Sequence, residues 1–162
     1  MSNTLDYLLK LLTAEAAVMD QINAGQSLRY NSNQRLILEY GKPFLKRVNP
    51  TPFKGEPKQC FQNCFEALWN HRELSYCEGY AIYKNSPIAV SHAWLVNDKL
   101  EVIDPTWIDE DSENCVYFGV VFTREFLIEF VTKTRVYGIL DSDYLNDYKL
   151  LNEGFPTGAL HS

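Results

Sequence analysis

An α+β fold is predicted by the order in which two hydrophobic periodicities follow one another along the chain. Apolar side chains recur at helical spacing in residues 4–23 and 123–134, whereas residues 74–122 carry mostly the two-residue alternation of strands. Strands that follow one another in mid-chain favour an antiparallel meander, with the flanking helices packed on it. A chain of 162 residues can bury one hydrophobic core, so we predict a single domain over residues 1–162.

Two helices and then a loop are expected at the start of the chain. The first helix covers residues 4–23, with Thr4 as its N-cap and Gly25 as its stop. A second helix covers residues 32–40. Residues 48–57 contain three prolines and one glycine, which predicts a loop.

The same N-terminal stretch is interpreted as a retained helix, because it has no basic region and Asp6 and Lys10 interrupt its apolar residues. No apolar run approaches the roughly 18 residues that a membrane span needs. The net charge of −6 is not typical of a nucleic-acid surface, which carries a basic excess. We therefore expect a cytoplasmic protein with four reduced cysteines and with neither nucleic acid nor membrane as a partner.

The middle of the chain is expected to hold one helix followed by a run of strands. The segment "KQCFQNCFEALWNH" has a helical pattern, and Pro57 stands near its first turn, where a missing N–H costs nothing. The alternating segments predict strands at residues 74–83, 88–96, 99–104 and 115–122.

His92 and Asp104 stand on either side of one predicted hairpin. A turn centred on Asp98 pairs Val96 with Leu100 and places His92 directly opposite Asp104. Cβ atoms of opposed residues are about 4.5–5.5 Å apart, so the carboxylate can bind and orient the imidazole, as in a nucleophilic triad. The alternative is a structural His–Asp hydrogen bond at the end of a sheet.

Cys60 is the candidate nucleophile among the four cysteines. It lies in the first turn of the predicted helix, where free backbone N–H groups and the helix dipole favour a thiolate. Cys64, one turn later, is interpreted as a small core residue, and Cys77 and Cys115 lie in strand patterns that favour burial.

Two other kinds of site are less well supported. Cys60, Cys64, Cys77 and His92, with His71 in reserve, would supply enough ligands for zinc, but the C-x₂-C spacing typical of structural zinc sites is missing. We therefore predict no metal. A serine nucleophile is disfavoured because the chain contains no G-x-S-x-G motif.

Four short motifs, "QCFQNC", "CEGYA", "HAW" and "IDPTW", together resemble the transglutaminase-like branch of the papain-like cysteine enzymes, and in particular small bacterial and bacteriophage-type members. The resemblance covers residues 55–122 and implies that they form the catalytic core. Residues 1–50 are then a helical N-terminal elaboration, and residues 123–162 are a C-terminal helix and tail. The resemblance also implies an antiparallel sheet packed against the helix that bears the nucleophile. By resemblance, Cys60 is the nucleophile, His92 the general base and Asp104 the orienting residue. The implied setting is the cytoplasm of a bacterium or of a phage-infected host.

Enzymes of this kind attack an amide or related acyl group and pass through a thioester. The resemblance therefore implies a hydrolase, deamidase or acyltransferase that acts on a protein, a peptide or a small amide without a cofactor. The sequence has no long insertion or calcium motif of the kind that protein-crosslinking transglutaminases carry. The alternative is a non-enzymatic binding or inhibitor module on the same fold, encoded by a phage and directed at a host or defence protein.

Five further residues are candidates for substrate positioning or oxyanion stabilisation. Gln59 is an oxyanion donor or else an ordinary exposed residue at a helix start. Asn63 and Glu78 belong to the resembling motifs. Glu78 either positions substrate or stabilises His92, or else makes a buried hydrogen bond to the sheet edge. Trp94 and Trp107 either wall the pocket or pack in the core.

Overall fold

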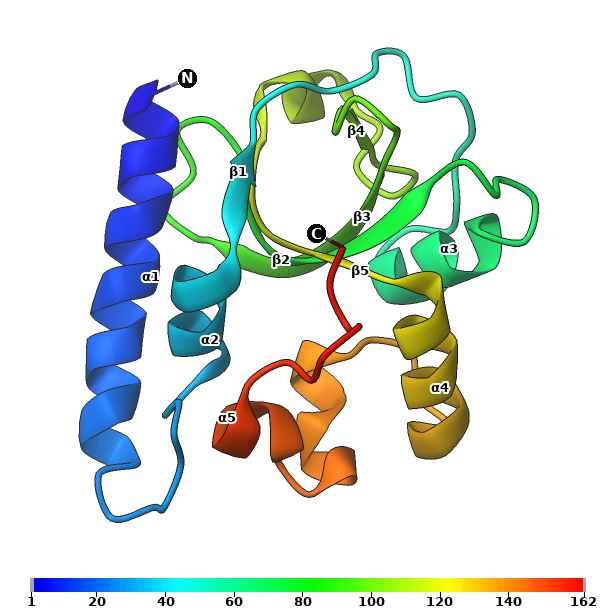
Figure 1. The fold of residues 1–162 in the computed structure, drawn as a ribbon. Helices are drawn as coiled ribbons and strands as arrows, with labels where there is room; N and C mark the ends of the chain where they lie inside the picture. Colours follow the sequence, from blue (N-terminus) through cyan, green and yellow to red (C-terminus); the bar gives the residue numbers. More distant parts are fainter. Residues whose placement is uncertain (1, 162) are drawn as a thin grey trace.

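The computed structural model describes residues 2–161 and has the α+β class that the sequence predicts (Figure 1). Within this range, five strands form one curled antiparallel sheet with the spatial order β1-β5-β2-β3-β4. The strands are β1 (Lys42–Phe44), β2 (Ser75–Ile82), β3 (Val90–Val96), β4 (Val102–Ile103) and β5 (Val116–Phe122).

Helices lie around the outside of the curled sheet. The α-helices among the described residues are α1 (Ser2–Ile22), α2 (Asn33–Tyr40), α3 (Cys60–Ala67), α4 (Arg124–Thr134) and α5 (Lys149–Glu153), and the 3₁₀ helices are η1 (Glu110–Asn114) and η2 (Leu140–Asn146). In Figure 1, α1 runs along one side of the molecule, while α3 and α4 lie on the other. Over residues 2–161, no helix combines the length and the apolar composition needed to cross a bilayer.

Helix ends follow local capping chemistry. Ser32 caps α2 by accepting the amide of Arg35 at 3.1 Å, and Thr123 caps α4 by accepting the amide of Phe126. The prediction that Thr4 caps the first helix is wrong, because α1 already includes Ser2. The helix predicted over residues 58–71 is shorter than expected, since Lys58 has φ of 63° and the chain becomes helical only at Cys60.

Side chains on the two faces of the sheet build two separate cores. The helix-side core joins α1–α4 to the outer face of the sheet. The strand-side core consists of residues in or beside strands and fills the inside of the curl: Phe44, Cys77, Ala81, Trp94, Val96, Val102, Cys115, Tyr117 and Val121. Because side chains alternate along a strand, neighbouring residues of β2 and β3 face opposite cores: Cys77 and Trp94 lie in the strand-side core, and Tyr76 and Leu95 lie in the helix-side core.

A pair of glycines allows two strands to approach closely at the centre of the sheet. Gly79 of β2 pairs with Gly119 of β5. A Cβ at Gly79 would lie 2.2 Å from the carbonyl oxygen of Phe118, and a Cβ at Gly119 would lie 2.7 Å from the ring of Trp94. Glycine at these two positions therefore makes room for the neighbouring backbone and for the indole inside the curl.

The sheet curls until its two edge regions meet, a feature that the sequence did not predict. No strand was predicted at β1. Just beyond β1, Lys46 and Val48 exchange backbone hydrogen bonds of 2.8 Å with Val102 in β4. This contact closes the ring of strands and brings the neighbouring Arg47 to the end of β4.

The predicted register of the β3–β4 hairpin is wrong by two residues. Val96 pairs with Val102 and not with Leu100. The connection is longer because the Oδ1 atom of Asn97 accepts the amides of Lys99 and Glu101 at 3.0 and 2.9 Å. A shift of two residues preserves the strand face, so His92 and Asp104 stay on the same side of the sheet.

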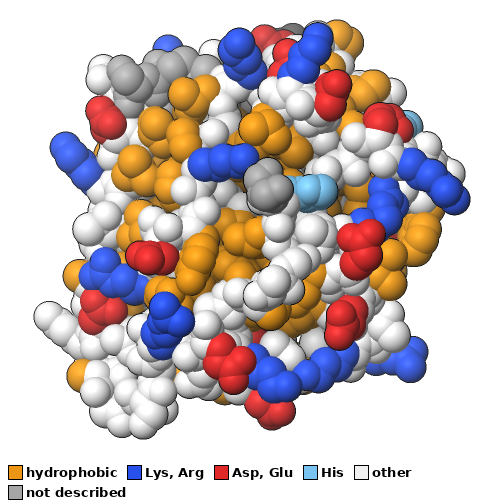
Figure 2. Space-filling model, in the orientation of Figure 1, with side chains coloured by type: hydrophobic (Ala, Val, Ile, Leu, Met, Phe, Trp, Pro, Cys, Tyr) orange, Lys and Arg blue, Asp and Glu red, His pale blue; other side chains and the backbone are white. Residues whose placement is uncertain are grey.

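Charged side chains of both signs are interspersed over the face seen in Figure 2, with hydrophobic side chains between them. The net charge of −6 is thus not gathered into one patch on this face. The last residues of the predicted tail lie beside β5, where the amide of His161 donates to the carbonyl of Val121 at 3.0 Å and Leu160 bridges Phe122.

Candidate active site

His92 and Asp104 are in direct contact inside the protein. The Nε2 atom of His92 lies 2.7 Å from Oδ2 of Asp104, and the exposed fractions of the two residues are 2% and 0%. Asp104 lies just beyond the end of β4, where Pro105 follows it. The expected His–Asp hydrogen bond is therefore present, although the ladder does not place the two residues directly opposite each other.

Four hydrogen bonds fix the carboxylate of Asp104. Its Oδ1 accepts the amides of Thr106 and Trp107 at 2.9 and 3.1 Å, while its Oδ2 accepts His92 and the hydroxyl of Tyr117 at 2.7 and 2.8 Å. Burial by itself would raise the pKa of Asp104. The charge and hydrogen bond of His92, with the two amides, outweigh burial and hold this pKa below its ordinary value.

Cys60 begins α3 and is buried, with 9% of its surface exposed. Its thiol is close enough to His92 to help raise the pKa of the imidazole. Since Nε2 of His92 donates to Asp104, Nδ1 is the ring nitrogen left for the thiol. Burial opposes protonation of His92, but the charge and hydrogen bond of Asp104, followed by those of Cys60, raise the pKa of His92 to about 9. The imidazole is thus favoured in its protonated form at neutral pH.

An aromatic stack covers one face of His92. The ring centroid of Trp107 lies 4.2 Å from that of His92 at an interplanar angle of 25°, and Tyr83 stacks on Trp107 at 4.4 Å. Trp94 lies farther away, at 6.5 Å, and is fully buried in the strand-side core. Trp107 therefore walls the imidazole, whereas Trp94 has the core-packing role that the sequence left open.

Asn63 joins two loops that border the candidate site. Its Nδ2 donates to the carbonyl of Glu56 at 2.8 Å and to the hydroxyl of Thr106 at 2.9 Å, and its Oδ1 accepts the amide of Glu56 at 3.0 Å. The amide of Gly55 also donates to the carbonyl of Pro105. The side chain of Asn63 thus holds the loop that carries Asp104 against α3.

Glu78 lies on the other face of the sheet from His92, so the suggestion that it supports His92 is wrong. In the ladder His92 is opposite Gly79, and alternation turns Glu78 towards the helices. Its carboxylate accepts the hydroxyl of Tyr76 at 2.7 Å and the amides of Ile139 and Leu140 at 2.7 and 3.0 Å. Glu78 therefore attaches the start of η2 to the sheet, and burial raises its pKa to about 7.

Gln59 occupies the N-cap position of α3 and is exposed. Its side chain makes no capping hydrogen bond. The backbone N–H of Cys60 lies in the first turn, where N–H groups have no acceptor within the helix. Both groups therefore remain candidates for oxyanion donors beside the thiol.

Arg47 and Tyr117 also contact Asp104, and no local sequence pattern pointed to either residue. The Nη1 atom of Arg47 donates to the Tyr117 hydroxyl at 2.8 Å and lies 4.0 Å from Oδ2 of Asp104. The Arg47 guanidinium also donates to the carbonyl of Trp107. The closure of the ring of strands, which joins residues far apart in the chain, brings these groups together.

The histidine and cysteine side chains considered as zinc ligands do not come together in the geometry of a metal site. Among residues 2–161, no group of three or more histidine, cysteine, aspartate or glutamate side chains is arranged to hold a metal ion. His71 stacks on Phe53 with ring centroids 4.2 Å apart. Burial raises the pKa of the Cys64 and Cys77 thiols well above the ordinary range, so both stay protonated.

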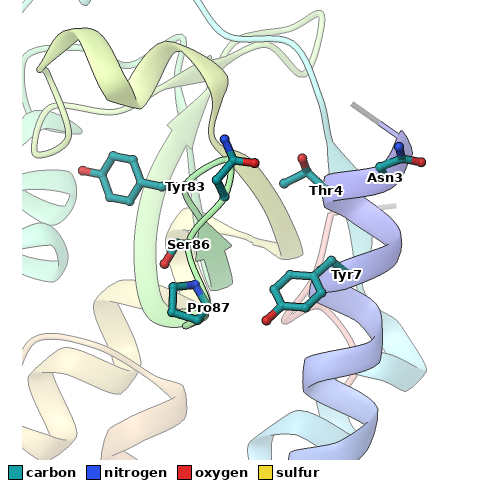
Figure 3. Close-up of a pocket in the computed structure, with 7 residues that line it drawn as sticks. Asn3, Thr4, Tyr7, Tyr83, Ser86 and Pro87 are labelled. Atoms are coloured by element: carbon teal, nitrogen blue, oxygen red, sulfur yellow. The ribbon is translucent and has the colours of Figure 1, made fainter.

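Two hollows lie beside the aromatic stack. A cavity of about 320 Å³ separates the first turns of α1 from the loop after β2, and Figure 3 shows Tyr7 on one side of it and Tyr83 and Pro87 on the other. A second hollow of about 540 Å³ lies between the same loop and η1, and its lining includes Tyr83, Lys84 and Asp109. Tyr83 thus connects both hollows to Trp107 and, through it, to His92.

Comparison with known proteins identifies no relative, since no protein-family model, no curated protein and no solved structure matches this chain.

Proposed function

We propose that the protein is a cysteine-dependent amide-processing enzyme of the transglutaminase-like, papain-like type, with Cys60, His92 and Asp104 as its triad. The observation that carries the proposal is the buried 2.7 Å hydrogen bond from His92 to Asp104. It is supported by the Cys60 thiol at the start of α3, which helps to raise the pKa of the same imidazole. A nucleophile, a proton carrier and an orienting carboxylate in this order form the arrangement that activates a cysteine.

Before the proposed reaction, the thiol proton of Cys60 has already passed to His92, whose raised pKa favours the protonated imidazole. The thiolate sulfur then forms a bond to the acyl carbon of an amide. The carbonyl electrons move onto oxygen, where the Cys60 N–H and the Gln59 side chain are the candidate donors. As the carbonyl reforms, the C–N bond breaks and the leaving amine takes the proton from His92. The product of this half-reaction is a thioester on Cys60.

The second half-reaction uses His92 as a base. Neutral imidazole takes a proton from water or from an amine, which attacks the thioester and releases Cys60. Water gives hydrolysis or deamidation, and an amine gives transamidation. Asp104 keeps the imidazole in one orientation through both halves, and the stacked Trp107 covers one face of its ring.

Peptide mapping after treatment with iodoacetamide at neutral pH tests the assignment of the nucleophile. We expect the wild type to be alkylated at Cys60, the Cys60→Ala variant to lose this labelling, and the Cys64→Ala variant to keep it. Cys64 is the matched control because it lies one turn away in the same helix and is fully buried. If a folded Cys60→Ala variant took up as much label per chain as the wild type, the assignment would be contradicted. An unreactive Cys60 in the wild type would favour a binding module instead.

A further inference from the structure

A chain of buried hydrogen bonds continues beyond the triad. Arg47, whose side chain is 5% exposed, donates from Nη1 to the hydroxyl of Tyr117 at 2.8 Å. The Tyr117 hydroxyl donates to Oδ2 of Asp104 at 2.8 Å. The same oxygen accepts His92 at 2.7 Å. One carboxylate oxygen thus accepts two donors, one of which is polarised by a guanidinium.

We propose that Arg47 and Tyr117 are positioning residues of the triad, which draw negative charge from Oδ2 of Asp104 and thereby set how firmly that carboxylate holds the proton of His92. This inference deepens the proposed function, on which it rests for its catalytic meaning.

The remaining contacts of Arg47 fit this role. Its guanidinium donates to the carbonyl of Trp107, whose amide donates to Oδ1 of Asp104 and whose ring stacks on His92. It also donates to the hydroxyl of Thr51 at 3.1 Å. A guanidinium offers five donors in one plane, which suits a group that must hold several acceptors at once. Arg47 therefore holds in place both the carboxylate that accepts the hydrogen bond of His92 and the indole that stacks on the imidazole.

Charge balance gives the reason for a buried cation at this place. When Cys60 is a thiolate and His92 is protonated, these two charges cancel, and Asp104 leaves one negative charge. Arg47 neutralises it at 4.0 Å. Uncompensated buried charge is costly, so Arg47 offsets the cost of keeping the Asp104 carboxylate ionised beside the pair.

Besides Arg47, the other titratable groups around Asp104 and His92 are thiols and phenols. From α3 these are Cys60 and Cys64, from β5 and the residue before it Tyr117 and Cys115, and from the end of β2 Tyr83. Burial raises the pKa of Tyr83, Cys115 and Tyr117, so none of these three competes for a proton near neutral pH.

Removal of the Tyr117 hydroxyl should therefore leave more charge on Oδ2 of Asp104 and strengthen its bond to the His92 proton. We expect Tyr117→Phe to move the titration midpoint of the His92 imidazole upward by about 0.3 unit or more. The phenylalanine keeps the aromatic ring in the strand-side core, so a purely packing role for Tyr117 predicts no shift.

NMR of protein with isotope-labelled histidine, titrated from about pH 5 to about pH 11, measures this midpoint directly. The chain has three histidines, so His71 and His161 serve as internal references. Tyr76→Phe is the matched control, because Tyr76 is also buried and donates to a carboxylate, that of Glu78, on the other face of the sheet. The Tyr76→Phe substitution should leave the titration midpoint of His92 unchanged. An unchanged or lowered His92 midpoint in folded Tyr117→Phe overturns the inference.

Arg47→Lys gives a second test, since it keeps the positive charge but loses the planar set of donors. We expect the same upward direction as for Tyr117→Phe, and a midpoint equal to that of the wild type would contradict a role for Arg47. The titration needs no turnover. If Cys60 proves unreactive, the proposed function fails, while the His92 midpoints still decide whether Arg47 and Tyr117 act on Asp104.

Discussion

The imidazole of His92 and the carboxylate of Asp104 are joined by a 2.7 Å hydrogen bond in a place that almost no solvent reaches. Both partners come from one hairpin, yet Asp104 reaches His92 from beyond the end of β4. The amides of Thr106 and Trp107 hold the far oxygen of the carboxylate at this point. The pair is therefore a fixed unit whose protonation depends on its own charges more than on solvent.

The Asp104→Asn variant should lose stability and change the titration of His92. An amide nitrogen at the position of Oδ2 cannot accept His92 or Tyr117, and Arg47 loses its counter-charge. We expect the free energy of unfolding to fall by about 3 kcal/mol. The His92 pKa should fall to its ordinary value or below, because only burial and Cys60 then act on it. Urea unfolding and histidine NMR measure the two effects, and a stable variant with an unshifted His92 would refute this prediction.

Stability should decline on the alkaline side of neutrality because of His92. Its folded pKa of about 9 lies above the ordinary histidine value of 6.5, so the folded state binds the proton more tightly than the unfolded chain does. The resulting stabilisation is complete below about pH 6.5 and is lost as the pH rises through about 9, with a total on the order of 3 kcal/mol. Urea unfolding at intervals across this window should show the decline. The Asp104→Asn variant is the control, and an equally steep decline in that variant would assign the effect to other groups.

Glu78 should produce a separate decline at lower pH. Burial raises its folded pKa from 4.5 to about 7, so the folded state favours the protonated carboxyl. The contribution of Glu78 to stability is therefore complete below about pH 4.5 and is lost as the pH rises through about 7. Glu78→Gln removes the titration, so the free energy of unfolding should change less between pH 5 and pH 7 than in the wild type. The same pH dependence in both proteins would contradict the assignment, whatever the absolute stability of the variant.

Gly79→Ala should destabilise the sheet strongly. The added methyl group would lie 2.2 Å from the carbonyl oxygen of Phe118, in backbone that cannot move without opening the ladder of β2 and β5. We expect a loss of about 3 kcal/mol or failure to fold. Gly25→Ala is the matched control, because no atom lies within 4 Å of its added Cβ, and it should be neutral or slightly stabilising. Similar thermal midpoints for the two variants would show that the close approach at Gly79 is not needed.

The sequence could predict that His92 and Asp104 share a face, but it could not predict their register. Side chains alternate between the two faces of a strand, so a register error of two residues leaves each side chain on its predicted face. The predicted hairpin register was wrong by two residues, and the shared face of His92 and Asp104 was therefore still correct. The register depended on Asn97, whose side chain binds two amides of the turn and lengthens it. The position of Cys60 at a helix start was predictable because the nearby Pro57 favours the beginning of a helix.

Contacts between distant segments were not predictable in this way. Arg47 reaches Asp104 only because Lys46 and Val48 pair with Val102 and close the ring of strands. Glu78 could be assigned to the helix side of the sheet only once the ladder showed that its neighbour Gly79 pairs with His92. Pairings of this kind depend on the curl of the sheet, and one sequence carries no local pattern for it.

The rate at which iodoacetamide alkylates Cys60 at neutral pH, compared between the wild type and His92→Gln, tests the proposed triad most directly. Glutamine keeps a polar side chain at this buried position but cannot take the thiol proton. If His92 activates Cys60, the variant should react more slowly by about tenfold or more while its circular dichroism spectrum stays unchanged. Equal rates in the two folded proteins would contradict the triad.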